Sequence, residues 1–386
     1  MKRINIKTKS ILFFLLSLTP MVYFISAIIN NKQLYAIKDL IMLIIFIILL
    51  FQSYPKFLYK FVVVFILINI YAIFISYEDI LFYILSVREF LFYPIVGILL
   101  GYYFAKYNSF EKYFYKFLLI AFILTIIYLA IFPFDSFSST MRLKSFWDRE
   151  HEPAIVAGVT FIWTLYSNYS KKFKYITILL SIIVMLLSAS RSALLGVFLV
   201  TFLINLRELK IRKIFLIFVI LSIGFTFFSK LSLSNRRIDH NLGERTSQYE
   251  LALENLEKNN LLGLGTDKYG VVGTIHKRYC YNGHCTTTMD STLIKYSVNY
   301  GILFIIFFIL FLFLIFILYI NIKNDFDKKI FSTLIFALVL GAITGKLGAY
   351  PLNIIFYMVF GLFIYRLNYI NLIRKRKNEK NTISSK

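Results

Sequence analysis

The sequence has little cysteine and few acidic residues. Its 386 residues include two cysteines, Cys280 and Cys285, which are too few for the disulfide framework of a small secreted protein. Asp and Glu together number 20, against 43 Lys and Arg, which gives a formal net charge of +23. A protein that binds nucleic acid gathers such an excess in one patch, but here the basic residues are spread over short segments between apolar runs. We therefore expect no nucleic-acid partner.

Long apolar runs take up most of the chain. Hydrophobic residues make up 59% of the sequence, 42 residues are Phe, and the mean hydropathy is +0.72. No soluble domain has enough surface to keep this composition in water, and apolar runs of roughly 17–25 residues are typical of transmembrane helices. The first run has no small-residue cleavage site and is followed by further runs, so we expect a span rather than a signal peptide. The predicted fold class is an all-α polytopic membrane protein.

Counting the runs predicts about 12 transmembrane helices. The predicted spans lie near residues 11–29, 34–51, 57–76, 80–104, 117–133, 153–169, 175–190, 191–206, 214–230, 291–320, 330–346 and 350–367. They divide the chain into a membrane bundle of nine spans over 1–230 with an outer loop at 134–152, a large extracytoplasmic loop at 231–290, spans ten to twelve over 291–367, and a basic tail at 368–386.

The charges between the spans predict the orientation. With the N-terminus in the cytoplasm, the cytoplasmic segments hold 26 basic and 5 acidic residues, a net of +21 out of the +23 of the whole chain. The opposite orientation would place nearly all of these basic residues outside, against the positive-inside rule. We therefore predict that both termini are cytoplasmic and that the long loop is extracytoplasmic.

This long loop, residues 231–290, is the one long polar stretch of the sequence. It contains 7 acidic residues, 7 Lys or Arg and three His. Tyr249, Ala252, Leu253 and Leu256 recur at helical spacing, which predicts a short amphipathic helix over 245–256. Loops longer than about 15 residues are usually functional or disordered, and this pattern favours function.

A second set of cations lies on the outer half of the predicted bundle. Its members are Arg88, Arg191, Arg142, Lys346 and Lys38. A charged side chain at membrane depth is costly unless it faces the bundle interior or a wet cavity, which favours a shared cationic cavity that opens outward. One alternative is a salt bridge with a sequence neighbour, Glu89 for Arg88 or Asp39 for Lys38. For Arg191 the alternative is a turn residue that snorkels to the interface.

Phosphate is the anion that such a cavity suits best. A guanidinium matches phosphate oxygens through paired hydrogen bonds and stays charged under all conditions. The pyrophosphate of a membrane lipid lies at this depth, with its hydrocarbon chain in the bilayer. We therefore predict that Arg191, in the stretch LLSASRSALLG, binds phosphate.

Four stretches resemble one family. LLSASRSALLG resembles the S-x-S-R-small-x-L element of the O-antigen polymerase (Wzy) and O-antigen ligase (WaaL) superfamily. RLKSFWDREHEPAIVAGV resembles its outer-loop segment, with Ser145 in place of a Gly. ERTSQYELALENLEKNNLLGLGTDKYG resembles its long-loop segment, with Asn260 in place of a Pro. MDSTLIKYSVNYGI resembles the segment that enters the next span, and its Asp290-Ser291 is typical of polymerases, whereas ligases usually have His-Asn.

The resemblance covers roughly residues 85–305 and implies a function. Such enzymes act on the outer face of the bacterial inner membrane on oligosaccharides linked to undecaprenyl pyrophosphate. A polymerase transfers the growing glycan from its lipid to the non-reducing end of a new lipid-linked repeat unit, without a nucleotide sugar, metal or other cofactor. It also implies a chain-length regulator (Wzz-like) as partner. An O-antigen ligase, which transfers the glycan to lipid A core, is the alternative, and a lipid-linked oligosaccharide flippase or transporter is a further one.

The reaction assigns roles to the cations and to a base. Preplaced cations stabilise the leaving pyrophosphate, and we expect Arg191, Arg88 and Arg245 to do so, with Arg142 and Lys346 as further substrate-binding residues. A base must accept the proton of the attacking hydroxyl. The candidates for this base are Asp290, His284, His276, His240 and Glu244, with Asp290 preferred.

Two further features of the long loop leave alternatives open. Gly263 and Gly265 either let the backbone approach a sugar or phosphate or form a tight turn after a helix. Cys280 and Cys285 can form a disulfide in an oxidising compartment. Together with His276 and His284 they fit no strong zinc pattern, so we predict no metal site.

Overall fold

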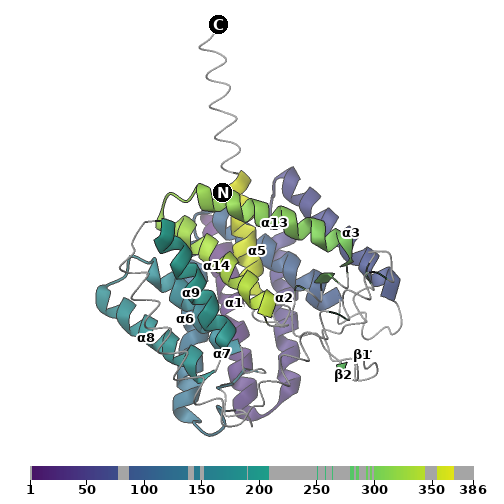
Figure 1. The fold of residues 1–386 in the computed structure, drawn as a ribbon. Coiled ribbons are helices and arrows are strands. Elements are labelled where there is room, and N and C mark those ends of the chain that lie inside the picture. Colours follow the sequence, from purple (N-terminus) through teal and green to yellow (C-terminus); the bar gives the residue numbers. More distant parts are fainter. Residues whose placement is uncertain are drawn as a thin grey trace.

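The structure is a computed structural model. It describes residues 2–76, 87–137, 143–147, 152–188, 190–207, 250, 257, 263, 279–281, 284–286, 293, 296–297, 300–343 and 354–368. The helices form one bundle around a largely apolar core (Figure 1).

Three long helices open the chain. They are α1 (Lys2–Ile29), α2 (Tyr35–Leu50), which follows the short 3-10 turn η1 (Lys32–Leu34), and α3 (Lys56–Ser76). α1 packs against both α2 and α6. The bounds of α2 and α3 lie within one residue of the predicted spans 34–51 and 57–76, because each helix follows one uninterrupted apolar run. α1 begins nine residues before the predicted span 11–29.

The fourth predicted span is not one regular helix in its described part. A π-helical turn, η2 (Val87–Phe92), precedes α5 (Tyr93–Lys106). Pro94 lies in the first turn of α5, where its missing N–H breaks the hydrogen-bond ladder, and this accounts for the change of helix type. Every residue of α5 from Tyr93 to Ala105 is buried, so α5 is the central helix of the bundle.

The next four helices follow in short succession. They are α6 (Phe110–Ile131), α7 (Glu152–Leu165), α8 (Lys171–Leu187) and α9 (Arg191–Arg207). The Ser170 hydroxyl accepts a hydrogen bond from the Phe173 backbone N–H and so caps the start of α8. α7 packs against α8, and α9 packs against α14 (Asp325–Ile343).

Gly301, with a φ of 59°, interrupts the helix in the C-terminal part of the chain. Residues 296–297 and 300 are helical before this break, and α13 (Ile302–Ile320) follows it. A final helix, Ile354–Asn368, follows α14. The described part of the long loop contains an antiparallel hairpin of two short strands, β1 (Tyr279–Tyr281) and β2 (His284–Thr286), which the all-α prediction did not include.

Close packing through glycine holds the centre together. A Cβ atom at Gly101 would overlap the Met358 carbonyl, and one at Gly361 would overlap the Ile98 carbonyl, so α5 and the final helix touch backbone to backbone. This use of small residues is typical of membrane helices. The ring of Phe336 on α14 fits between Gly158 on α7 and Gly196 on α9 in the same way.

The helices include membrane-spanning candidates. Lys7–Ile29, Phe110–Ile131 and Ile302–Ile320 are long and apolar enough to cross a bilayer, and Glu152–Leu165, Ser192–Leu206 and Ile354–Asn368 are shorter apolar helices. The protein is therefore a helical membrane protein. The count of 12 spans, the cytoplasmic termini, the division into four parts and the side of the long loop remain predictions.

Candidate functional site

Arg88 is bound by a carboxylate from another helix. Its Nη1 atom lies 3.3 Å from Oδ2 of Asp39 on α2, and the Tyr93 hydroxyl donates a hydrogen bond to the other Asp39 oxygen. About a third of each charged side chain is exposed, 30% for Arg88 and 33% for Asp39. The salt bridge considered for Arg88 thus forms, but with Asp39 as the partner. It ties the start of α2 to the π-helical turn, a helix type that is rare and often found at functional sites.

Lys38, the residue before Asp39, is bound by aromatic rings. Its Nζ atom donates a hydrogen bond of 2.6 Å to the Tyr23 hydroxyl. The same atom lies 5.0 Å from the ring centroid of Tyr23 and 5.7 Å from that of Tyr35, within the range of cation–π attraction. Lys38 and Arg88 thus place two cations and one carboxylate at the same end of α2.

The first outer loop is fixed to this end of the bundle at Ser145. Its backbone N–H donates to the Ser136 carbonyl at 2.9 Å, and its hydroxyl donates to the Thr125 carbonyl at 3.2 Å. Ser145 has a φ of 55°, in the left-handed region that favours glycine. The conformation gives a physical reason for the Gly that the family has at this place. Buried Trp147 adds a hydrogen bond of 3.0 Å to the Thr125 hydroxyl.

The stretch LLSASRSALLG forms the break between α8 and α9. α8 ends at Leu187, and the Ser188 hydroxyl donates to the Val184 carbonyl at 2.8 Å. The Ser190 hydroxyl accepts a long hydrogen bond of 3.4 Å from the Ala193 N–H at the start of α9. Both serines are buried, so their hydroxyls supply hydrogen bonds at the two helix ends where the backbone ladder is interrupted.

Arg191 is the first residue of α9, so it lies at this break, as predicted. The Leu143 backbone N–H donates to the Leu187 carbonyl at 2.9 Å, which brings the first outer loop to the turn that Arg191 follows. The first N–H groups of a helix favour an anion at this position. The backbone thus places a cation, a helix N-terminus and the outer loop side by side.

The other predicted site residues are described only in part. Gly263 is buried with a φ of 85°, which agrees with the turn interpretation. His284 begins β2. The remaining candidates, which lie outside the described residues, are Arg142, Arg245, Asp290, Lys346, Gly265, His276, His240 and Glu244. Within the part of the chain that the structure describes, no three His, Cys, Asp or Glu residues gather as a metal site.

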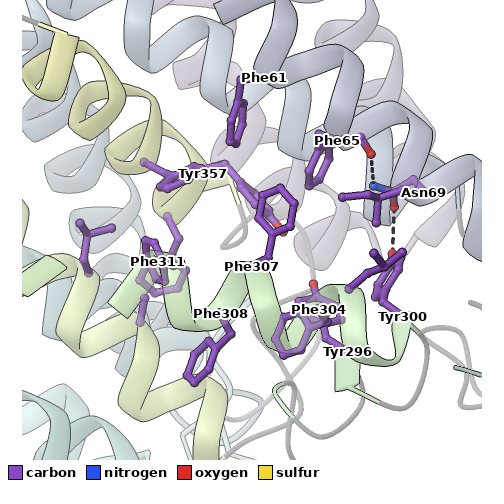
Figure 2. Close-up of a pocket in the computed structure, with 16 residues that line it drawn as sticks. Phe61, Phe65, Asn69, Tyr296, Tyr300, Phe304, Phe307, Phe308, Phe311 and Tyr357 are labelled. Atoms are coloured by element: carbon purple, nitrogen blue, oxygen red, sulfur yellow. Dashed lines mark hydrogen bonds between the residues drawn. The ribbon is translucent and has the colours of Figure 1, made fainter. Parts of the chain in front are cut away.

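An apolar cavity lies beside α13 (Figure 2). It has a volume of about 260 Å³, and its walls come from α3, from residues 296–311, from α14 and from the final helix. The Tyr300 hydroxyl donates to the Asn69 side-chain oxygen at 2.8 Å, and the Asn69 amide donates to the Phe65 carbonyl at 2.8 Å. These polar groups thus bind one another, and eleven Phe and Tyr side chains supply most of the lining.

Comparison with known families adds the deciding observation. The family model described as O-antigen ligase matches residues 176–309, a little over a third of the chain. The matched segment begins in α8, includes the break at Arg191 and ends in α13. This match supports the assignment of the segment 176–309 to the O-antigen polymerase and ligase superfamily. Among curated proteins, none matches the chain.

The matched domain supports a function of O-antigen polymerase or ligase type. Arg191, Gly263 and His284 lie inside the matched segment, as do Arg245, Gly265 and Asp290. Arg88, Asp39 and Tyr93 lie outside it. The sequence drew attention to Arg88 but not to Asp39, which pairs with it from 49 residues away on another helix, nor to Tyr93, whose hydroxyl donates to Asp39.

Proposed function

We propose that this protein is a polysaccharide polymerase that extends an O-antigen or capsule repeat-unit glycan on a lipid carrier. The carrying observation is the family match over 176–309, which includes Arg191 at the start of α9. In the reaction, the sugar hydroxyl at the non-reducing end of a lipid-linked repeat unit attacks the anomeric carbon of the growing glycan. A new glycosidic C–O bond forms, the bond to undecaprenyl pyrophosphate breaks, and the hydroxyl proton passes to a base.

The cations at the outer end suit the leaving group. Negative charge develops on the pyrophosphate as its bond to the sugar breaks, and preplaced donors stabilise that charge most in the transition state. Arg191 and Arg245 take this role, and Arg142 and Lys346 bind the substrate. Asp39, which accepts a hydrogen bond from the Tyr93 hydroxyl, pairs with Arg88 on the π-helical turn, so the Arg88 guanidinium is oriented before substrate arrives.

The base is Asp290, with His284 as the alternative. Both lie in the long loop, Asp290 at its return to the bundle and His284 in β2. A carboxylate or imidazole within hydrogen-bond reach of the attacking hydroxyl accelerates such a step by roughly 10²–10⁴-fold. Gly263 and Gly265 allow the backbone of the loop to approach the glycan.

The cavity beside α13 suits the hydrocarbon chain of the carrier. Only 11% of the α13 span is buried, so its far side is exposed to lipid, while Phe304, Phe307 and Phe311 face the cavity. A cavity of about 150 Å³ holds a benzene molecule, so one of about 260 Å³ holds a short segment of branched hydrocarbon. An apolar space next to lipid favours a substrate with a membrane-embedded chain.

An O-antigen ligase is the second candidate function. It is favoured by the description of the matched family. The polymerase is preferred because Asp290-Ser291 stands where ligases usually have His-Asn. We further propose placement in the bacterial inner membrane with the long loop outside, and a chain-length regulator of the Wzz type as partner.

Deletion of the gene followed by gel analysis of the surface polysaccharide tests the function. Loss of a polymerase leaves a single repeat unit on the acceptor and removes the ladder of longer chains, and the intact gene restores the ladder. Loss of a ligase or flippase removes every attached unit, which would replace the polymerase proposal by one of these. An unchanged ladder would contradict all three.

A further inference from the structure

The hairpin in the long loop places the two cysteines directly opposite each other. β1 and β2 are antiparallel, and their register pairs Tyr281 with His284 and Cys280 with Cys285. These are the only two cysteines among the 386 residues of the chain. The pairing of these two cysteines across the strands favours a covalent bond between them.

The geometry of such a hairpin brings this pair within bonding range. The register leaves two residues between the strands, Asn282 and Gly283, the sequence that two-residue hairpin turns prefer. Tyr281 and His284 then close the turn through its hydrogen bond. Hydrogen-bonded and non-hydrogen-bonded pairs alternate along an antiparallel ladder, so the next pair is non-hydrogen-bonded, with Cα atoms about 4.5 Å apart. Disulfides span Cα distances of about 4.4–6.8 Å.

We propose that Cys280 and Cys285 form a disulfide that closes this hairpin on the oxidising side of the membrane. The inference rests on the proposed outer placement of the long loop and not on the reaction that the protein catalyses. The two thiols lose two protons and two electrons as the S–S bond forms. A thiol–disulfide oxidoreductase of that compartment takes up the electrons through a mixed disulfide, and its own disulfide is reduced to two thiols.

The disulfide has a structural consequence for His284. An isolated two-stranded hairpin is marginally stable in water, and a slip of one residue would move every side chain to the opposite face. A covalent bond between Cys280 and Cys285 fixes the register of β2 against β1. His284, the residue before Cys285, is the first residue of β2. The disulfide therefore holds one of the two base candidates in a single register.

Acid trapping of the full-length protein in its native membrane tests the proposal. Cells are quenched in acid, the protein is denatured, and free thiols are tagged with a maleimide polymer that shifts the band on a gel. The wild type is expected to carry no tag without reduction and two tags after reduction. Cys280→Ser and Cys285→Ser are each expected to carry one tag without reduction. Two tags on the unreduced wild type, or a dimer that reduction dissolves, would overturn the proposal.

A register-shifted variant separates the hairpin from mere proximity within the loop. Cys285→Ser combined with Thr286→Cys moves the second thiol to the position opposite Tyr279, out of register with Cys280. We expect most of these chains to carry two tags without reduction, and complete oxidation of this variant would contradict the paired geometry. Because the tags report only on thiols, the result is independent of whether the polymerase proposal succeeds.

Discussion

Charged residues gather at both ends of α5, but the two groups differ in burial and in pairing. At the Lys106 end, Asp327 is 1% exposed, and Arg366 contacts both of its oxygens, Nε at 3.0 Å and Nη2 at 3.1 Å. At the Tyr93 end, the Arg88–Asp39 pair shows a single contact of 3.3 Å, and a third of each side chain is exposed. The first arrangement links two helices through a buried carboxylate, whereas the second leaves the charged groups partly exposed.

The Lys106 end includes a second ion pair, in which the lysine is buried and the carboxylate of Glu111 is 53% exposed. Lys329 on α14 is 3% exposed, pairs with Glu111 on α6 and lies 5.5 Å from the ring centroid of Trp163 on α7. The Trp163 indole N–H donates to the Thr333 hydroxyl at 3.0 Å. Three helices thus meet around buried and bonded polar groups. We therefore expect substitutions at this end to affect the fold and those at the other end to affect the reaction.

Asp327→Ala is expected to have the largest effect. It leaves the Arg366 guanidinium without its carboxylate, and breaking a buried pair costs about 3–5 kcal/mol. The measurement is the temperature at which the detergent-solubilised protein loses its monodisperse peak. Asp325→Ala is the matched control, because Asp325 is 56% exposed and its pair with Lys328 is worth about 1 kcal/mol or less. Equal effects of the two variants would contradict the comparison.

Arg191→Ala is expected to leave the melting temperature nearly unchanged and to remove the polysaccharide ladder. Loss of one donor to a developing negative charge costs roughly 10²–10³ in rate. Arg191→Lys should recover little activity, because Lys keeps the charge but lacks the planar fork. Arg207→Ala, at the other end of α9, is the control and should keep the ladder. A normal ladder from Arg191→Ala would refute the phosphate role.

Asp39→Asn tests whether the exposed pair belongs to the reaction. The amide oxygen can still accept from Tyr93, but the charge that orients Arg88 is lost. We expect a loss of about 1 kcal/mol or less in stability, because the pair is partly exposed, together with a several-fold rise in KM for the lipid-linked substrate. Tyr93→Phe keeps the charge and should change KM less. A drop in melting temperature as large as that of Asp327→Ala would show that both ends of α5 serve only the fold.

Filling the cavity is expected to give the smallest effect. Ala337→Leu adds bulk to the cavity wall on α14, so KM should rise a few-fold for a donor with a long prenyl chain and stay unchanged for one with a short chain. Ile306→Phe on α13 is the control, since its side chain is 50% exposed and lies outside the cavity lining. An equal KM change for both donors would count against a hydrocarbon site.

The approximate positions of the described helices could be predicted because each follows a local apolar run, although α1 begins nine residues and α6 seven residues before the predicted span. α9 begins at Arg191, where its span was predicted to begin, since the break after the small residues Ser188 to Ser190 is visible in sequence. The π-helical turn was not predicted, although Pro94 was a signal for it. The hairpin was missed because two strands of three residues in a long loop give too short a pattern, even with Asn282-Gly283 between them.

The site was predicted less completely than the helices. Arg88 and Arg191 could be selected as site residues from the sequence, because a charged residue at membrane depth is costly and stands out among apolar neighbours. The pairing of Arg88 with Asp39 and the cavity between four separate segments are tertiary contacts, and no periodicity encodes them. Ser145 could be predicted in part. The resembled family pattern has Gly at this position, and the φ of 55° that the structure gives Ser145 explains why glycine is favoured there.

The ring of Phe336 between Gly158 and Gly196 has a mechanical consequence. Sliding α7, α9 or α14 past one another would drive a backbone into that ring, so the ring resists relative sliding of the three helices. The turn at Arg191 begins one of these helices, α9, and shares this restraint. α13 is less restrained, because only 11% of its span is buried and a glycine with a positive φ, Gly301, stands at its start.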